Sequence, residues 1–196
     1  MMDKNIDFFN IKYKSVSPRQ GKILIAEPRL ADDYFNRAVI ILTEHNENET
    51  IGFVLNNMVS VQLNEIIPDF PQFKATVSIG GPVAPNSIHF IHTLGNIIPE
   101  TKCIGNNLYW GGDFDIVTHL ISQGKINPQQ IRFFLGYSGW GENQLVNEIK
   151  ENSWVVSELD VVQIMAGKEN LWSRAVQQMG PRFKPWTIYP ASPLLN

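Results

Sequence analysis

Segments with the composition of β-strands fill the first part of this chain, and helical segments begin only after residue 112. The runs rich in β-branched and aromatic residues lie at 23–26, 38–43, 51–55, 76–79, 88–92, 103–104 and 108–110. Since most of the strands precede the helices, with alternation only late in the chain, this order favours an α+β fold. We therefore expect a curved, largely antiparallel sheet in preference to a doubly wound parallel one.

Capping residues and glycines mark the expected helices. Asp113 is a good N-cap for a helix over 114–123, which Gly124 ends. A helix over 142–151 follows the strong strand at 131–135, and a short strand at 154–156 comes next. The segment 157–160 can cap a further turn, and 63–68 forms a short helical turn at best. A last helix is expected to begin after an N-cap at residue 170 and to end before residue 180.

The length of 196 residues, with 43% hydrophobic and 18% charged residues, suits one domain with a real core. We expect an N-terminal arm over residues 1–18, a single domain over 19–182 and a C-terminal tail over 183–196. The tail carries Phe183, Trp186, Ile188 and Tyr189 between prolines, so it is expected to be extended and not helical. Burial of these side chains is favourable, which predicts that the tail lies along its own domain or a partner subunit.

The charge and cysteine content exclude several classes of protein. The net charge is −3 and no basic stripe is visible, so direct nucleic-acid binding is not expected. The single cysteine, Cys103, excludes an intramolecular disulfide and a cysteine-based zinc site, and it is expected to be buried and inert. The charged N-terminus does not resemble a signal peptide, and no apolar run is long enough to span a membrane. A cytoplasmic protein is expected.

The stretch FFLGYSGWGENQ, residues 133–144, combines glycines, two aromatic residues and one serine. It does not fit the G-x-S-x-G nucleophile elbow, because the glycine after Ser138 comes one residue early and Trp140 stands where a small residue is required. The glycines instead predict a sharp bend from a strand into a helix. The first amides of that helix form either an anion site or a plain structural turn, and the turn is favoured.

Neither a metal site nor a cofactor site is expected. His89 and His92 are three residues apart in a strand, so their side chains point to opposite faces and cannot share a metal. Gly80-Gly81-Pro82 follows a strand but is not followed by the lysine of a phosphate loop. Arg132 lies within an apolar strand and is either buried against a carboxylate or carbonyls or placed on a solvated face. The solvated face is slightly favoured.

Four segments together resemble the AlgH/YqgE family of bacterial proteins: GKILIAEPRLADDYFNRAVIILTEHNENETIGFVLNN (21–57), SIGGPV (78–83), NNLYWGGDFDIVTHLISQGKINPQQIRFFLGYSGWGENQLVNEI (106–149) and SWVV (153–156). The resemblance implies a single α+β domain whose bifurcated sheet folds into a pseudo-barrel with helices packed outside. It implies no established enzymatic activity and no known cofactor. The family is sometimes labelled a transcriptional regulator, a label that rests on genetics and not on a DNA-binding element.

This chain departs from the family pattern at three places. Asn57-Met58 replaces Arg-Pro, so a basic group is missing. Ser138 stands where alanine is common, which argues against a nucleophile at that position. The helix start at 142–144 is less glycine-rich than in the family, and Val146 stands where the family has an acidic residue.

Polar residues at the ends of apolar strands, beside glycine turns, predict a concave site that binds a small-molecule ligand. The candidates for this pocket are Glu44, His45, Asn56, Gly80, Gly81, Arg132, Tyr137, Trp140 and Gln144. A ligand-binding or regulatory protein is the favoured function. The alternatives are an enzyme that acts on a small molecule near Glu44, His45 and Arg132, and a DNA-binding regulator. The sequence leaves homo-oligomerisation open.

Overall fold

The computed structural model describes residues 11, 16–30, 32 and 34–190. The strands in these residues are β1 (Ile23–Ala26), β2 (Val39–His45), β3 (Glu49–Val54), β4 (Met58–Val59), β5 (Thr76–Ile79), β6 (Val83–His92), β7 (Lys102–Gly105), β8 (Leu108–Trp110), β9 (Ile131–Gly141) and β10 (Trp154–Ser157). The α-helices are α1 (Leu63–Ile66), α2 (Phe114–Ser122), α3 (Gln144–Lys150), α4 (Val161–Met165), α5 (Leu171–Gln178) and α6 (Lys184–Ile188), and the 3-10 helices are η1 (Pro128–Gln130) and η2 (Pro181–Phe183).

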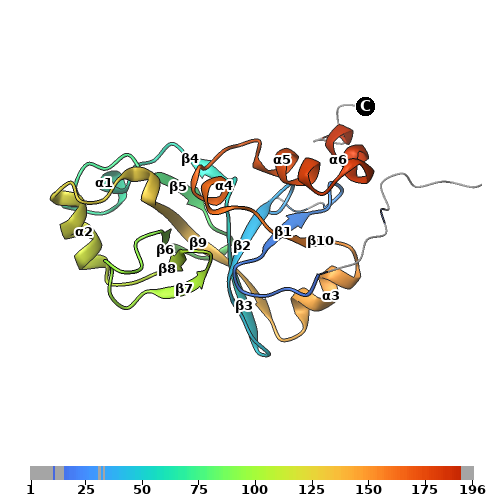
Figure 1. Cartoon of the computed structure of the whole chain (residues 1–196), viewed down its shortest axis with the longest axis horizontal. Coiled ribbons are helices and arrows are strands. Elements are labelled where there is room, and N and C mark those ends of the chain that lie inside the picture. Colours follow the sequence, from blue (N-terminus) through green and yellow to red (C-terminus); the bar gives the residue numbers. More distant parts are fainter. Residues whose placement is uncertain (1–10, 12–15, 31, 33, 191–196) are drawn as a thin grey trace, which may run out of the picture.

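The strands form one sheet in the order β10-β1-β2-β3-β9-β6-β8-β7, with β5 on β9 and β4 on β5. Only the β5–β9 pair is parallel among the pairings of the described residues. The expected α+β fold with a curved, bifurcated and largely antiparallel sheet is therefore confirmed (Figure 1). In the described residues β10 and β7 lie at opposite ends of the strand order, so the sheet is not closed into a barrel.

The long strand β9 belongs to both halves of the sheet. Its first half pairs with β5 and β6, and its second half pairs with β3. Gly136 lies between the two halves with a φ of 65°, and a Cβ there would come within 2.8 Å of the carbonyl oxygens of Gly81 and Val83. Only glycine fits this bend. The predicted strand-to-helix bend is therefore wrong, because the strand continues to Gly141 and the helix begins at Gln144.

Helices cover both halves of the sheet (Figure 1). On the half formed by β10, β1, β2 and β3, α4 and α5 bury one face, and α3 packs against the other through Leu145 and Ile149. The second half carries its own core, to which α1 contributes Leu63 and α2 contributes Val117 and Ile121. The predicted N-caps Asp113 and Asp160 accept hydrogen bonds from Ile116 and Gln163 amides at 3.0 and 2.7 Å, respectively.

Arg132 is completely buried at the start of β9, where its guanidinium joins four segments. It donates to the carbonyl oxygen of Leu55 at 2.7 Å, to Oγ of Ser78 at 3.0 Å and to the carbonyl oxygen of Ile164 in α4. Burial lowers the pKa of Arg132 to about 10, so the side chain remains a cation at neutral pH. The favoured prediction of a solvated Arg132 is wrong, because these main-chain acceptors stabilise the charge inside the protein.

Cys103 is exposed and not buried as expected. It lies in β7, the strand at the end of the sheet order, and its neighbour Ile104 is the residue whose side chain enters the core. Because successive side chains of a strand point to opposite faces, burial of Ile104 turns Cys103 outward.

The C-terminal segment is docked on the domain but is not extended. Phe183 and Trp186 are each 1% exposed, while η2 and α6 form a compact helical end. The prediction that prolines exclude a helix is wrong, because Pro185 lies in the first turn of α6, where a missing amide costs no hydrogen bond. Residues 191–196 and most of the expected N-terminal arm lie outside the described residues.

We expect Arg132→Met to lower the free energy of unfolding by about 2–4 kcal/mol, since it leaves the carbonyl oxygens of Leu55 and Ile164 without their donor. Ser78→Ala, which removes only one of the three contacts, should cost about 1 kcal/mol. Urea denaturation of both variants measures the difference. If Arg132→Met is as stable as Ser78→Ala, the guanidinium does not hold these segments together.

We expect Trp186→Ala to cost about 3–5 kcal/mol, because a buried indole is removed from the core. The matched control is Ile188→Ala in the same helix, whose side chain is 72% exposed and whose loss should change stability by about 0.5 kcal/mol or less. Thermal and chemical unfolding of the two variants test the docking of α6. Equal stabilities would contradict it.

Candidate functional site

Two clefts flank the segment in which β9 ends and α3 begins. We call them the hairpin cleft, next to the β2–β3 turn, and the tryptophan cleft, next to the side chains of Trp140 and Trp154. The predicted pocket residues do not come together at one place in the structure. His45 lines the first cleft, whereas Trp140 and Gln144 line the second.

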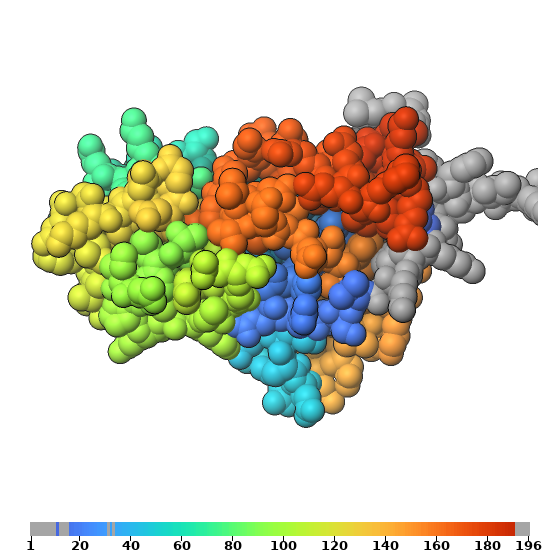
Figure 2. Space-filling view, in the orientation of Figure 1, coloured from blue at the N-terminus to red at the C-terminus, as the bar shows by residue number. Residues whose placement is uncertain are grey.

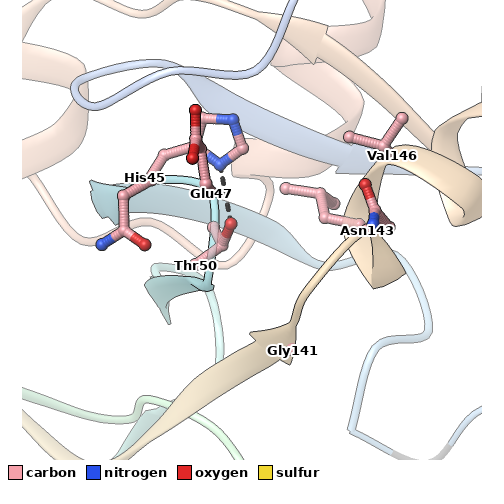
Figure 3. Close-up of a pocket in the computed structure, with 8 residues that line it drawn as sticks. His45, Glu47, Thr50, Gly141, Asn143 and Val146 are labelled. Carbon is pink, nitrogen blue, oxygen red and sulfur yellow. Dashed lines mark hydrogen bonds between the residues drawn. The ribbon is translucent and has the colours of Figure 1, made fainter.

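The hairpin cleft has a volume of about 350 Å³ and lies between the β2–β3 turn and the start of α3. Figure 3 shows His45, Glu47 and Thr50 across the cleft from Asn143 and Val146. His45 Nδ1 lies 2.7 Å from Thr50 Oγ1, a contact between paired residues of the two strands. Apart from this contact the polar lining is largely exposed turn residues, so the cleft fixes few groups for a ligand.

Glu44 does not join His45 in this cleft. Its carboxylate forms an ion pair with Lys102 Nζ at 3.0 Å, which links β2 to β7. Arg132 lies in the interior and lines neither cleft. The expected grouping of Glu44, His45 and Arg132 is therefore not present.

The tryptophan cleft has a volume of about 450 Å³. Its wall combines three aromatic side chains with two acidic residues and small polar or aliphatic neighbours: Phe35, Trp140, Trp154, Asp32, Glu148, Leu30, Pro82, Gly139, Gln144 and Ser153. The rings are packed against one another. Phe35 stacks on Trp140 with centroids 6.4 Å apart and meets Trp154 edge-on at 5.6 Å.

Glu148 is the fixed polar group of the tryptophan cleft. Its Oε2 accepts the indole N–H groups of Trp140 at 2.9 Å and Trp154 at 2.7 Å. Its Oε1 accepts from Gln144 Nε2 at 3.0 Å. A carboxylate held by three donors has one orientation, which is the property that a binding site needs.

Asp32 places a second carboxylate on the same wall. Its Oδ1 accepts the amides of Tyr34 and Phe35 at 2.8 and 3.0 Å, an arrangement typical of aspartate at a turn. Among the described residues that line the cleft, Asp32 and Glu148 are the only charged ones, and both are acidic. The cleft therefore favours a cationic group over an anionic one.

The other predicted residues have structural roles. Asn56 accepts the Val39 amide at 2.8 Å and donates to the Arg37 carbonyl at 2.9 Å, so both ends of its side chain are bonded to the main chain. A Cβ on Gly80 would lie 2.3 Å from the Gly136 carbonyl oxygen, and one on Gly81 would lie 2.4 Å from Tyr137 main-chain atoms. These glycines let two chain segments cross closely beside the bend in β9.

Ser138 and the start of α3 carry no evident chemistry. Ser138 is buried and donates to the Gly80 carbonyl at 3.0 Å, in agreement with the expectation that it is not a nucleophile. Gln144 Oε1 accepts a hydrogen bond from the Gly141 amide at 3.1 Å, which fits the interpretation of this segment as a structural turn. Asn143 adopts a left-handed conformation with a φ of 58°, which delays the helix relative to the predicted start.

His89 and His92 face opposite sides of β6, as the sequence predicts. His89 packs against Phe53 and Tyr137, whereas His92 is stacked on Tyr109. His92 Nδ1 accepts the Leu94 amide at 3.1 Å, so its other nitrogen carries the proton that faces the Gly111 carbonyl at 2.9 Å. Within the described part of the chain, no group of three potential ligand side chains could hold a metal ion.

Sequence reasoning missed Asp32, Phe35, Glu148 and Trp154. One feature of the sequence could have indicated Glu148. It lies four residues after Gln144, so the two side chains are neighbours on one face of a helix, and eight residues after Trp140. The contribution of Phe35 and Trp154 depends on the pairing of β10 with β1, which single-sequence periodicity does not reveal.

The fold and the clefts define an α+β protein with a bifurcated open sheet and two preformed clefts at the end of its shared strand. None of the helices in the described residues is long and apolar enough to cross a membrane. The model of the AlgH-like family matches residues 23–184, and the chain belongs to this family, which has no established function.

Relatives and solved structures agree with this assignment. The chain is 45% identical to a UPF0301 protein of Parabacteroides distasonis over 98% of both sequences, and 39% identical to one of Bacteroides fragilis over the full length of both. It is similar to the solution structure of AlgH from Pseudomonas aeruginosa, with a TM-score of 0.71, 28% identity and coverage of 92% and 98% of the two chains. A crystal structure from Corynebacterium diphtheriae has a TM-score of 0.74 at 21% identity, with 90% and 95% coverage, and shows the same fold.

Burial of His92 predicts a pH-dependent stability. Desolvation lowers the pKa of His92 in the folded state, although the hydrogen bond to Gly111 partly opposes this. As the pH falls below about 6.5, the unfolded chain gains the proton first, so folding loses free energy until the pH passes the folded pKa. We expect His92→Gln to reduce the loss of stability between pH 7.5 and pH 5, as measured by urea denaturation. His119→Gln, at an exposed histidine, is the control. The same pH dependence in His92→Gln and wild type would contradict this role.

Proposed function

We propose that the protein binds a small organic cation in the tryptophan cleft. The observation that carries this proposal is the orientation of the Glu148 carboxylate by two indole N–H groups and the Gln144 amide. Such a carboxylate needs no rearrangement when an ammonium group approaches. This reduces the entropic cost of binding.

The composition of the cleft supports a cationic ligand with an apolar body. Asp32 adds a second negative charge, and the part of the lining that the structure describes contains no lysine, arginine or histidine. Phe35 is half-buried and stacks on Trp140, so its ring edges the cleft with apolar surface. Carboxylates beside aromatic rings are the groups that bind organic ammonium ions in proteins. The volume of about 450 Å³ suits a molecule of the size of a substituted aromatic amine.

The arrangement supports binding and not catalysis. The Glu148 carboxylate accepts three hydrogen bonds that hold it in one orientation. Among the described residues of the cleft, no hydrogen bond pairs a nucleophile with a base, the pairing from which acyl-transfer sites are built. The role proposed is therefore that of a ligand-binding protein, in which the cation bridges Glu148 and Asp32.

Benzylamine serves as the probe, and the neutral benzyl alcohol is the matched control ligand. The indole N–H signals of Trp140 and Trp154 in a nitrogen–proton correlation spectrum report on Glu148 directly. We expect saturable shifts of both signals with benzylamine and little change with benzyl alcohol. No saturable shift, or equal shifts with both compounds, would show that the cleft is not a cation site.

Variants separate the charge from the packing. Glu148→Gln retains an acceptor for the indole groups, and Asp32→Asn retains an acceptor for the turn amides, so each removes mainly a charge. We expect each to weaken benzylamine binding about tenfold, or ~1.4 kcal/mol. Glu151→Gln changes the same charge at an exposed position just beyond α3 and should have no effect. If Glu151→Gln weakened benzylamine binding equally, the losses in the other two variants would reflect long-range charge and not a local cation site.

A further inference from the structure

A third concave surface lies next to α4 and near the start of β9, whereas the tryptophan cleft lies near the end of that strand. We call it the α4 groove. It has a volume of about 410 Å³ and runs between α4, the segment leading into β5 and the segment around η1. Figure 2 shows the orange surface of the α4 region next to the yellow region that contains η1, on one face of the molecule.

One wall of the α4 groove is apolar. It is formed by Val161, Val162, Met165 and Ala166, all on or directly after α4. The helix buries Ile164 in the core, but Val162 is 78% exposed. A valine in this position gains nothing from packing within the domain, whereas an apolar ligand in the groove would cover it.

The floor of the groove lies on the same face of the sheet as Arg132. Thr76 and Ile91 are the register partners of Arg132 on the two neighbouring strands, so their side chains share its face. Lys74 precedes β5 and Thr93 follows β6, and both line the groove together with Thr76. Arg132 is thus a sheet neighbour of Thr76, but its guanidinium is bonded to Leu55, Ser78 and Ile164 and does not line the groove. The two threonine hydroxyl groups can donate hydrogen bonds into the groove.

The lining of the groove carries a positive charge. Among the described residues of the lining, Lys74 is the only charged one, and it is exposed. Neither Lys74 nor Arg132 forms an ion pair with a carboxylate of the described residues. The acceptors of Arg132 are neutral, so its charge is solvated by dipoles but not cancelled. An anionic group in the groove would be attracted by the ammonium group of Lys74.

We propose that the α4 groove binds a small organic anion, a carboxylate with a short apolar chain. The carboxylate lies near Lys74, Thr76 and Thr93, and the chain covers Val162 and Met165. This site is independent of the tryptophan cleft, whose acidic lining selects the opposite charge. The two proposals therefore predict ligands of opposite sign at separate places on one domain.

Hexanoate serves as the probe, with the neutral hexanamide as the matched control ligand. We expect saturable shifts of the Thr76, Thr93 and Ala166 amide signals with hexanoate, and at least about tenfold weaker binding of hexanamide. No saturable shift of these signals, or equal binding of the two compounds, would overturn the proposal. Shifts confined to the tryptophan cleft would overturn it as well.

Variants test the two halves of the site. Lys74→Gln should weaken hexanoate binding about five- to tenfold without changing the affinity for hexanamide, whereas Lys125→Gln, at an exposed lysine outside the lining, should change neither. Val162→Ser should weaken both ligands, because it removes apolar surface and leaves the charge intact. Since Val162 and Lys74 are exposed, these variants should fold as wild type does. Equal losses in Lys74→Gln and Lys125→Gln would contradict a local anion site.

Discussion

The structure depends on one strand that serves two sheet halves. β9 pairs with β5 and mainly with β6 before Gly136 and with β3 from Ser138 on, so the two halves of the sheet are joined through a single continuous strand. A strand that is shared in this way needs a residue with a left-handed backbone and no Cβ at the point where the two halves of the sheet meet. It also requires a donor at the start of the strand to satisfy the carbonyl oxygens of the segments that converge there. Gly136 and Arg132 meet these two needs.

Much of this fold is predictable from the sequence, because most of the elements are local. Strand β1, strand β5 and the cap of α2 follow from β-branched runs and from one aspartate, and the structure has them where the patterns place them. The incorrect predictions of secondary structure lie where tertiary contacts override the local conformational preference of the sequence. The sequence after Gly136 predicts a turn, yet pairing with β3 keeps this segment in a strand to Gly141. Pro185 predicts that no helix forms, yet in the first turn of α6 its missing amide costs no hydrogen bond.

The candidate site was harder to predict than the fold, for a related reason. Polar residues near glycine turns predict one pocket, but in the folded domain the nine predicted residues lie at several different places. Asn56 and Arg132 satisfy main-chain groups, and Glu44 is paired with Lys102. Trp140 and Gln144 do line a cleft, but the residue that orders them, Glu148, lies beyond the motif. Which buried polar group serves structure and which serves a ligand is decided by partners distant in sequence.

The continuity of β9 also bears on how the clefts respond to a ligand. Many binding proteins place their sites between lobes that open and close about a flexible link, and part of the binding energy is spent on closure. Here the two halves of the sheet share a hydrogen-bonded strand, so they have no such hinge between them. The tryptophan cleft is built from the end of this strand, and its wall is further tied by the contacts of Glu148. For the ligand that we propose, the shape of the cleft is therefore set before binding, and selection among ligands falls to fit and charge.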